Sequence, residues 1–488
     1  MNPLKKLFKQ TAIYGLATVL PRMLNFLLLP LYTGILVTAG YGRVSVIFAW
    51  IAIFNVFLAY GMETAFFRFY NKSEDKQKVV STSLISIFGT TLLFIITALL
   101  FQSAMAKATD IDLEFIRYAI AILALDAFVI VPFAWLRANE KATIYALIKI
   151  TNVGINLGLN LFFLLWLPKL AEGNPDGFYS WIYRPDFEIS YIFISNVGAS
   201  AITLILMLPL YFKTPYVFDK VLWKRMINYA WPVLVAGIAF TINEVFDKIL
   251  LERLLPADIA ESETGMYAAC YKLGMFMTLF ATAFRMGIEP FFFSHAGTAN
   301  PQRAYAQITN YFVVLGSVIL LTVVVFSDVL KALFIDEDYW EAMSVVPLIL
   351  LASFFLGIYH NLSVWYKVTD KTRYGALISV VGAIITIGIN YAFIPSIGYM
   401  ASAIATVLAY GTMMVLSYYL GKSRYPVPYN FRKILFYLGL SILFSTLSFY
   451  VFDRNLFVGS ILLLLFLGLV YKLENDKLRQ IFLKSEAK

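Results

Sequence analysis

Ten ionisable side chains interrupt the long apolar stretches of this chain, and they are the residues most able to carry chemistry. A charged group inside a stretch that crosses a membrane is energetically costly, so we expect each of them to have a partner or a function. They are Arg22, Glu63, Asp126, Lys149, Glu244, Asp247, Lys248, Lys272, Arg285 and Glu289.

Spacing predicts that some of these charges neutralise each other within one helix. Glu244 and Lys248 are four residues apart, as are Arg285 and Glu289, and side chains at this spacing are neighbours on a helix surface. Four carboxylates are expected to serve as gate or coupling groups: Glu63, Glu289, Glu244 and Asp247.

Asp126 and Lys149 lie at similar estimated depths in two successive apolar stretches. A base and an acid at the same depth can offset the cost of burying both charges. The sequence therefore predicts a structural ion pair between them.

Arg22 and Lys272 have no acidic residue three or four positions away. The planar fork of an arginine suits a phosphate group, so an unpaired arginine inside the membrane favours an anionic cargo. The first apolar stretch, Thr11–Val37, contains no Asp or Glu that could serve a cationic cargo. We expect cargo contacts at Arg22, Lys272, Arg285 and Lys248.

Neither a metal site nor a cofactor is expected. The chain has the single cysteine Cys270, which excludes an internal disulfide, and two isolated histidines, His295 and His360.

Apolar stretches occupy almost the whole chain, in which 60% of the 488 residues are hydrophobic and 14% are charged. About fourteen stretches reach the roughly 20 residues that an α-helix needs to cross a bilayer. Strand-like alternation is absent, so the sequence predicts an all-α integral membrane protein and not a β-barrel.

Lysine and arginine are unevenly distributed over the predicted loops. With the N-terminus placed in the cytoplasm, the inside loops and tails carry 26 of the 39 basic residues and the outside segments carry 8. Inside loops are rich in basic residues, so both termini are predicted to be cytoplasmic. This distribution explains the net charge of +9, and no nucleic-acid partner is expected.

One pattern occurs twice along the chain. At an offset of 226 residues, Gly61-Met62-Glu63 aligns with Gly287-Ile288-Glu289, and at an offset of 230 Trp135 aligns with Trp365. At the same offset of 230, Gly158-x-Asn160 aligns with Gly388-x-Asn390. Duplicated halves in a membrane protein are typical of transporters that work by alternating access.

Six predicted helices per copy give both copies the same orientation, as parallel repeats. The predicted domains are an N-terminal lobe over residues 1–212, a C-terminal lobe over 213–420, and two appended helices with a cytoplasmic tail over 421–488.

Several motifs resemble those of the bacterial polysaccharide-biosynthesis flippases. They are Tyr41-Gly42, the segment Gly61-x-Glu63-x-x-Phe66-Phe67-Arg68-Phe69, and Trp135-Leu136-Arg137-Ala138. That family belongs to the MOP exporter superfamily, with the MATE drug exporters and the lipid II flippase.

The resemblance implies that the protein flips an undecaprenyl-pyrophosphate-linked oligosaccharide, such as an O-antigen precursor of lipopolysaccharide, across the bacterial cytoplasmic (inner) membrane. It also implies a cavity between the lobes lined by Arg22, Lys272 and Arg285. The implied partners are the lipid-linked substrate, membrane lipids and the polysaccharide assembly machinery.

Three other functions remain open from the sequence. A MATE-type multidrug or cation antiporter is disfavoured by the acid-free first helix. A membrane polysaccharide polymerase or glycosyltransferase needs catalytic residues in a large outside segment, and the longest polar gap, about residues 168–189, has no histidine. We therefore do not expect an enzyme. The third is a scaffold for envelope assembly that transports nothing.

Arg22→Ala is expected to abolish transport while membrane insertion stays normal, because the arginine is predicted to bind the cargo. Membrane content and surface polysaccharide, measured in a strain that carries only this variant, check the prediction. Full function of the variant would contradict it and would favour the scaffold.

Overall fold

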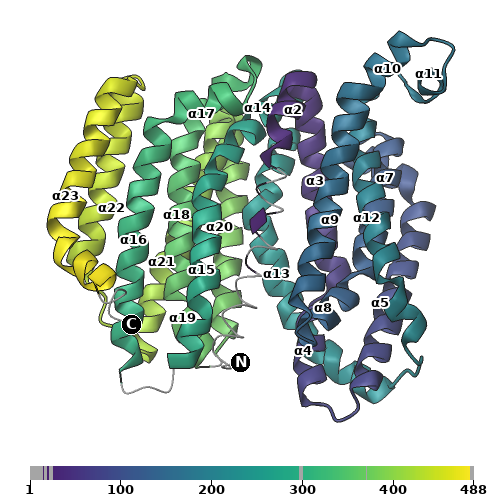
Figure 1. The fold of residues 1–488 in the computed structure, drawn as a ribbon, viewed down its shortest axis with the longest axis horizontal. Coiled ribbons are helices and arrows are strands. Elements are labelled where there is room, and N and C mark those ends of the chain that lie inside the picture. The colour runs from purple at the N-terminus through teal and green to yellow at the C-terminus, as the bar shows by residue number, and fades with distance from the viewer. Residues whose placement is uncertain are drawn as a thin grey trace. The chain divides into compact units, whose positions relative to one another are not determined.

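A computed structural model describes residues 26–295, 300–369 and 371–483, together with positions 15, 19, 20 and 23. Every regular element in these ranges is a helix, which confirms the predicted all-α fold. Figure 1 shows these helices, from α3 in purple to α23 in yellow.

Eleven helices within the described ranges are long and apolar enough to cross a membrane, so the chain is a multi-pass membrane protein. The predicted stretch at residues 11–36 lies mostly outside those ranges. The stretches at 228–254 and 264–293 lie in α13 (Lys220–Leu254), α14 (Ala260–Tyr271) and α15 (Met275–His295), which carry ionisable residues. The count of fourteen stays a prediction.

The first compact unit contains residues 1–269 and 373–402. Within it α13 packs along α3 and α20, and α12 packs on α7 and α9. Besides α13 and most of α14, its helices are α2 (Leu28–Ile35), α3 (Thr38–Ala59), α4 (Met62–Lys72), α5 (Lys76–Leu100), α6 (Gln102–Thr109), α7 (Leu113–Phe128), α8 (Ile130–Ala138), α9 (Ala142–Leu161), α10 (Leu167–Gly173), α11 (Phe178–Ile182), α12 (Glu188–Lys213) and α20 (Arg373–Ile397).

The second compact unit contains residues 270–372 and 403–488. Within it α15, α16 and α18 pack on one another, and α22 and α23 pack on α16. Besides α15, its helices are α16 (Pro301–Val325), α17 (Ser327–Phe334), α18 (Val346–Leu362), α19 (Val364–Val368), most of α21 (Tyr399–Arg424), α22 (Phe431–Thr446) and α23 (Leu456–Leu483).

Packing and the sequence repeat divide the chain at different positions. The helices α13 and α20 fall in the predicted second lobe, yet they pack within the first unit. The lobes at 1–212 and 213–420, and the appendage at 421–488, stay predictions about the repeat.

Two asparagines at equivalent positions of the repeat, Asn160 and Asn390, are fully buried. Each side-chain amide donates to the backbone carbonyl four residues earlier, at 2.8 and 2.7 Å. Each side-chain oxygen accepts from a hydroxyl group, that of Tyr32 at 2.9 Å and that of Ser402 at 2.6 Å. Both buried amides are thus satisfied inside the protein, as membrane helices require.

The helices α3 and α14 cross with their backbones in contact. A Cβ atom on Gly42 would lie 2.0 Å from the carbonyl oxygen of Glu261, and one on Gly265 would lie 1.9 Å from that of Thr38. The Arg43 Nε donates to the Glu261 carboxylate at 2.6 Å beside this crossing. Small residues allow such close approach, so both glycines are needed here.

Gly42→Ala is expected to lower the free energy of unfolding by about 1–3 kcal/mol, because the added methyl group overlaps backbone atoms of α14. Thermal unfolding of the purified protein in detergent measures the effect. Gly154→Ala is the matched control, since a Cβ there meets nothing within 4 Å. Equal unfolding midpoints for the two variants would contradict the prediction, because α3 and α14 could then move apart without loss of stability.

Candidate functional site

Glu63 stands at the start of α4 because the preceding helix is broken by Gly61. Tyr60 and Gly61 have φ values of 32° and 71°, in the left-handed region that favours glycine. A Cβ on Gly61 would lie 2.5 Å from the carbonyl oxygen of Ala230 in α13. Glu63 thus lies in the first turn of α4, where the helix dipole favours a negative charge.

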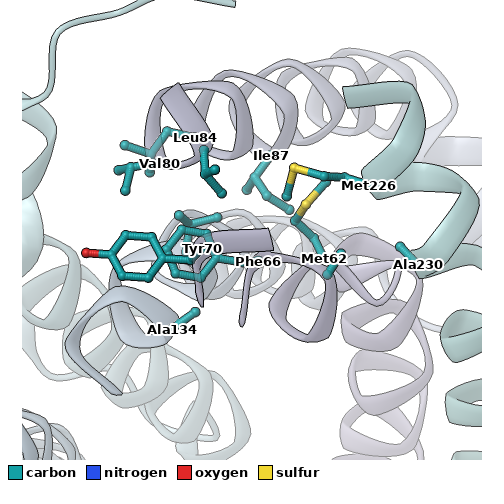
Figure 2. Packing of buried hydrophobic residues seen from close by; sticks show 12 residues of the cluster. Met62, Phe66, Tyr70, Val80, Leu84, Ile87, Ala134, Met226 and Ala230 are labelled. Atoms are coloured by element: carbon teal, nitrogen blue, oxygen red, sulfur yellow. The ribbon is translucent and has the colours of Figure 1, made fainter. Parts of the chain in front are cut away.

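A buried apolar cluster fixes the orientation of α4. Figure 2 shows Met62, Phe66 and Tyr70 of α4 packed with Leu84 of α5 and Met226 of α13. These α4 positions recur at the helical period, so they form the buried face. Glu63 and its neighbour Phe67 lie at the edge of that face and are partly exposed.

The same ion pair occurs in both copies of the repeat. In the first unit an Arg137 Nη1 donates to the Glu63 carboxylate, and the guanidinium lies 4.9 Å from the Phe67 ring centroid. In the second unit the Lys367 Nζ donates to the Glu289 carboxylate at 2.7 Å. Glu63 and Glu289 are related by the offset of 226 residues, and Arg137 and Lys367 by the offset of 230.

Each of these pairs joins two helices of one unit, α4 with α8 and α15 with α19. Each therefore has a structural role in its own copy. The expected gate or coupling role of Glu63 and Glu289 stays a prediction.

In the second unit, basic side chains meet around a very small cavity. The Arg285 Nη1 lies 3.4 Å from the Nε2 of His360, and Glu289 and Lys367 line the same space. Its volume of about 10 Å³ is close to the size of one water molecule. In the conformation described, this space is too small for a sugar or a pyrophosphate, so cargo contact by Arg285 requires the space to open. Lys272 lies in the helical turn before α15 and is not in its lining.

A much larger cavity, of about 570 Å³, lies in the first unit. Its walls come from α3, α4, α7, α8, α9, α12 and α13, and include the apolar residues Phe133 and Leu234. The polar side chains in its lining are Asn55, Glu63, Thr64, Asp126, Tyr145, Lys149, Asn152, Asn196, Ser200 and Thr203.

Asp126 and Lys149 both line this cavity and their charges attract each other, and a direct ion pair between them stays a prediction. The Ser200 hydroxyl donates to the Asp126 carboxylate at 2.8 Å. The Lys149 Nζ lies 4.2 Å from the ring centroid of Phe133, a cation–π contact. Ser200 and Phe133 thus contact the two charged groups, and both groups lie on the cavity wall.

The predicted pairing of Glu244 with Lys248 is corrected. The Lys248 Nζ contacts the carboxylate of the adjacent Asp247 at 3.1 Å, and the Tyr267 hydroxyl donates to the same carboxylate at 2.6 Å. Asp247 lies on the buried face of α13, whereas Glu244 is exposed. The lysine therefore turns toward the buried acid.

The predicted cargo residues that the structure describes belong to different units. Lys248 lies on α13 outside the lining of the large cavity, whereas Arg285 and Lys272 lie in the second unit. Arg22 lies outside the described residues. Cargo contact by these four residues stays a prediction.

Sequence reasoning did not predict the ion-pair roles of Arg137 and Lys367, although the repeat register places them at equivalent positions. It also missed the cavity residues of α12, Asn196, Ser200 and Thr203, whose helical spacing is a readable signal. No group of three or more His, Cys, Asp or Glu that could hold a metal occurs in the described ranges.

A family model described as "Polysaccharide biosynthesis protein" matches residues 7–296 of the chain. A second model, "MatE", matches residues 229–392. No curated protein sequence is similar enough to the chain to match it.

Solved structures that are similar to this chain include transporters and a flippase. The lipid II flippase MurJ in an inward closed conformation superposes with a TM-score of 0.71 at 13% identity, covering 94% of this chain and 99% of that one. A Vibrio cholerae MATE transporter gives 0.61 at 14% identity, covering 87% and 98%. A MOP superfamily transporter from Pyrococcus furiosus gives 0.57 at 16% identity, covering 86% and 94%.

Asp247→Asn is expected to reduce the free energy of unfolding by about 3–5 kcal/mol, because it leaves Lys248 without its buried carboxylate. Thermal unfolding in detergent checks this, with Glu244→Gln as the control on the exposed face of the same helix. Equal loss in both variants would mean that the burial of Asp247 has no energetic importance.

Proposed function

The chain belongs to the polysaccharide biosynthesis protein family, and we propose that it moves an undecaprenyl-pyrophosphate-linked oligosaccharide across the bacterial cytoplasmic membrane. Movement is by alternating access, from the inner to the outer leaflet, with both termini in the cytoplasm. The O-antigen precursor of lipopolysaccharide is one such cargo.

The observation that supports this proposal best is a large polar cavity inside membrane helices of a chain from this family. Polar and charged groups within membrane helices are costly and mark pathways for polar cargo. A volume of about 570 Å³ falls in the range of small-molecule sites, about 300–1,000 Å³. Lipid-linked oligosaccharides require such a path because their sugars cannot cross hydrocarbon unaided.

In this proposal the pyrophosphate is bound by basic residues, and Arg22, Lys272 and Arg285 are the candidates. An arginine can offer two parallel N–H donors to a phosphate. Lys248 is the fourth candidate, and its pairing with Asp247 would have to break before it could bind cargo. Membrane lipids and the polysaccharide assembly machinery are the proposed partners.

A second candidate function is export of cationic drugs. The match of the MatE model over residues 229–392 favours it. The two functions predict different effects of gene loss, because one concerns surface polysaccharide and the other concerns sensitivity to toxic cations.

A strain that lacks this gene is expected to accumulate undecaprenyl-linked oligosaccharide on the cytoplasmic side and to lose surface polysaccharide. Lipid extraction with mass spectrometry, and gel analysis of surface polysaccharide, measure both effects. Complementation with Arg285→Gln is expected to restore less than a tenth of wild-type surface polysaccharide, because the pyrophosphate loses a cationic partner.

Arg303→Gln is the matched control, since Arg303 is exposed on α16 and does not line the small cavity around Arg285. It is expected to restore wild-type polysaccharide at equal membrane content. Unchanged surface polysaccharide in the deletion strain, together with sensitivity to cationic dyes, would overturn the proposal in favour of drug export.

A further inference from the structure

The large cavity of the first unit has no excess of positive charge. The carboxylate of Glu63 is neutralised by Arg137. Asp126 and Lys149, the other two charged side chains in the lining, carry opposite charges. A pyrophosphate group bears several negative charges and needs a surplus of basic donors. The cavity is therefore unsuited to the anionic part of a lipid-linked cargo.

The remaining polar groups of the lining are amides and hydroxyls, and some of their hydrogen-bonding atoms point into the protein. The Asn152 amide donates to the Thr203 hydroxyl at 2.9 Å, and the Asn196 amide donates to a backbone carbonyl at 3.0 Å. In both cases the side-chain oxygen is left to accept a bond from a ligand. The carboxylate of Asp126 accepts from the side chains of Ser200 and Asn55 and, with about four lone-pair positions, can accept further bonds.

Aromatic surface lies beside these polar groups. Phe133 and Tyr145 both line the cavity, and their rings meet edge to face with centroids 5.3 Å apart. Neutral sugars present hydroxyl groups at their rims and C–H groups on their ring faces. Amide and carboxylate acceptors next to aromatic carbons match both kinds of surface.

From this charge balance and lining we infer that the cavity of the first unit binds the neutral, hydroxyl-rich sugar part of the cargo, apart from the pyrophosphate. The inference rests on the proposed function for the identity of the cargo. The glycan and the pyrophosphate are therefore bound by different residues of the same chain, and the two contacts can be removed independently.

The test measures binding of two soluble probes to the purified full chain in lipid nanodiscs by isothermal titration calorimetry. One probe is the repeat-unit oligosaccharide released by mild acid from the surface polysaccharide of the host strain, and the other is inorganic pyrophosphate. Asn152→Leu is expected to weaken oligosaccharide binding at least tenfold and to leave pyrophosphate binding unchanged. Arg285→Gln is expected to weaken pyrophosphate binding at least tenfold and to leave oligosaccharide binding unchanged.

Asn196→Leu serves as a second cavity variant, so that a folding defect in one does not decide the outcome. Asn71→Leu is the matched control, because Asn71 is exposed at the end of α4 and does not line the cavity. Thermal unfolding of each variant verifies that it is folded.

Three results would overturn the inference: no binding of the oligosaccharide by the wild type, unchanged binding in both cavity variants, or loss of pyrophosphate binding in those variants. Failure of the proposed function looks different. In that case the deletion strain accumulates no lipid-linked oligosaccharide, while the binding measurements on the purified protein retain their meaning.

Discussion

Polar side chains in the membrane helices have to find their partners inside the protein, because hydrocarbon offers none. Much of the described structure follows from this constraint. Asn160 and Asn390 each bond a hydroxyl and a backbone carbonyl, and Asp247 is held by Tyr267 and Lys248. Such bonds fix which faces of the helices meet, and those of Asn160 and Asn390 occur at equivalent positions of the two copies.

The constraint also distinguishes two kinds of polar group. Groups such as Asn160 or Asp247 are buried and engaged in protein contacts, so they stabilise helix packing. Groups such as Asn152 and Lys149 border an open volume and keep bonding capacity toward it. The second kind costs stability unless a ligand or water completes its bonds, which is why it is informative about function.

Sequence alone predicted the helical membrane fold, the duplication and the equivalence of Glu63 and Glu289, because hydropathy and the repeat register are local patterns. It failed where pairing depends on which way a side chain faces. Spacing made Glu244 the partner of Lys248, but the buried Asp247 takes that place. Estimated depth placed Asp126 near Lys149, but it could not reveal that Ser200 and Phe133 also contact them. The cavity is built from seven helices far apart in the chain, and no local pattern encodes it.

Gly61 and Gly287 occupy the same position in the two copies, yet their surroundings differ. Gly61 has a positive φ and touches the backbone of α13, whereas a Cβ on Gly287 would meet nothing within 4 Å. An alanine is therefore expected to be tolerated at Gly287 but to strain the backbone at Gly61. The same residue at equivalent positions of a repeat can thus be required by the backbone in one copy and be dispensable in the other.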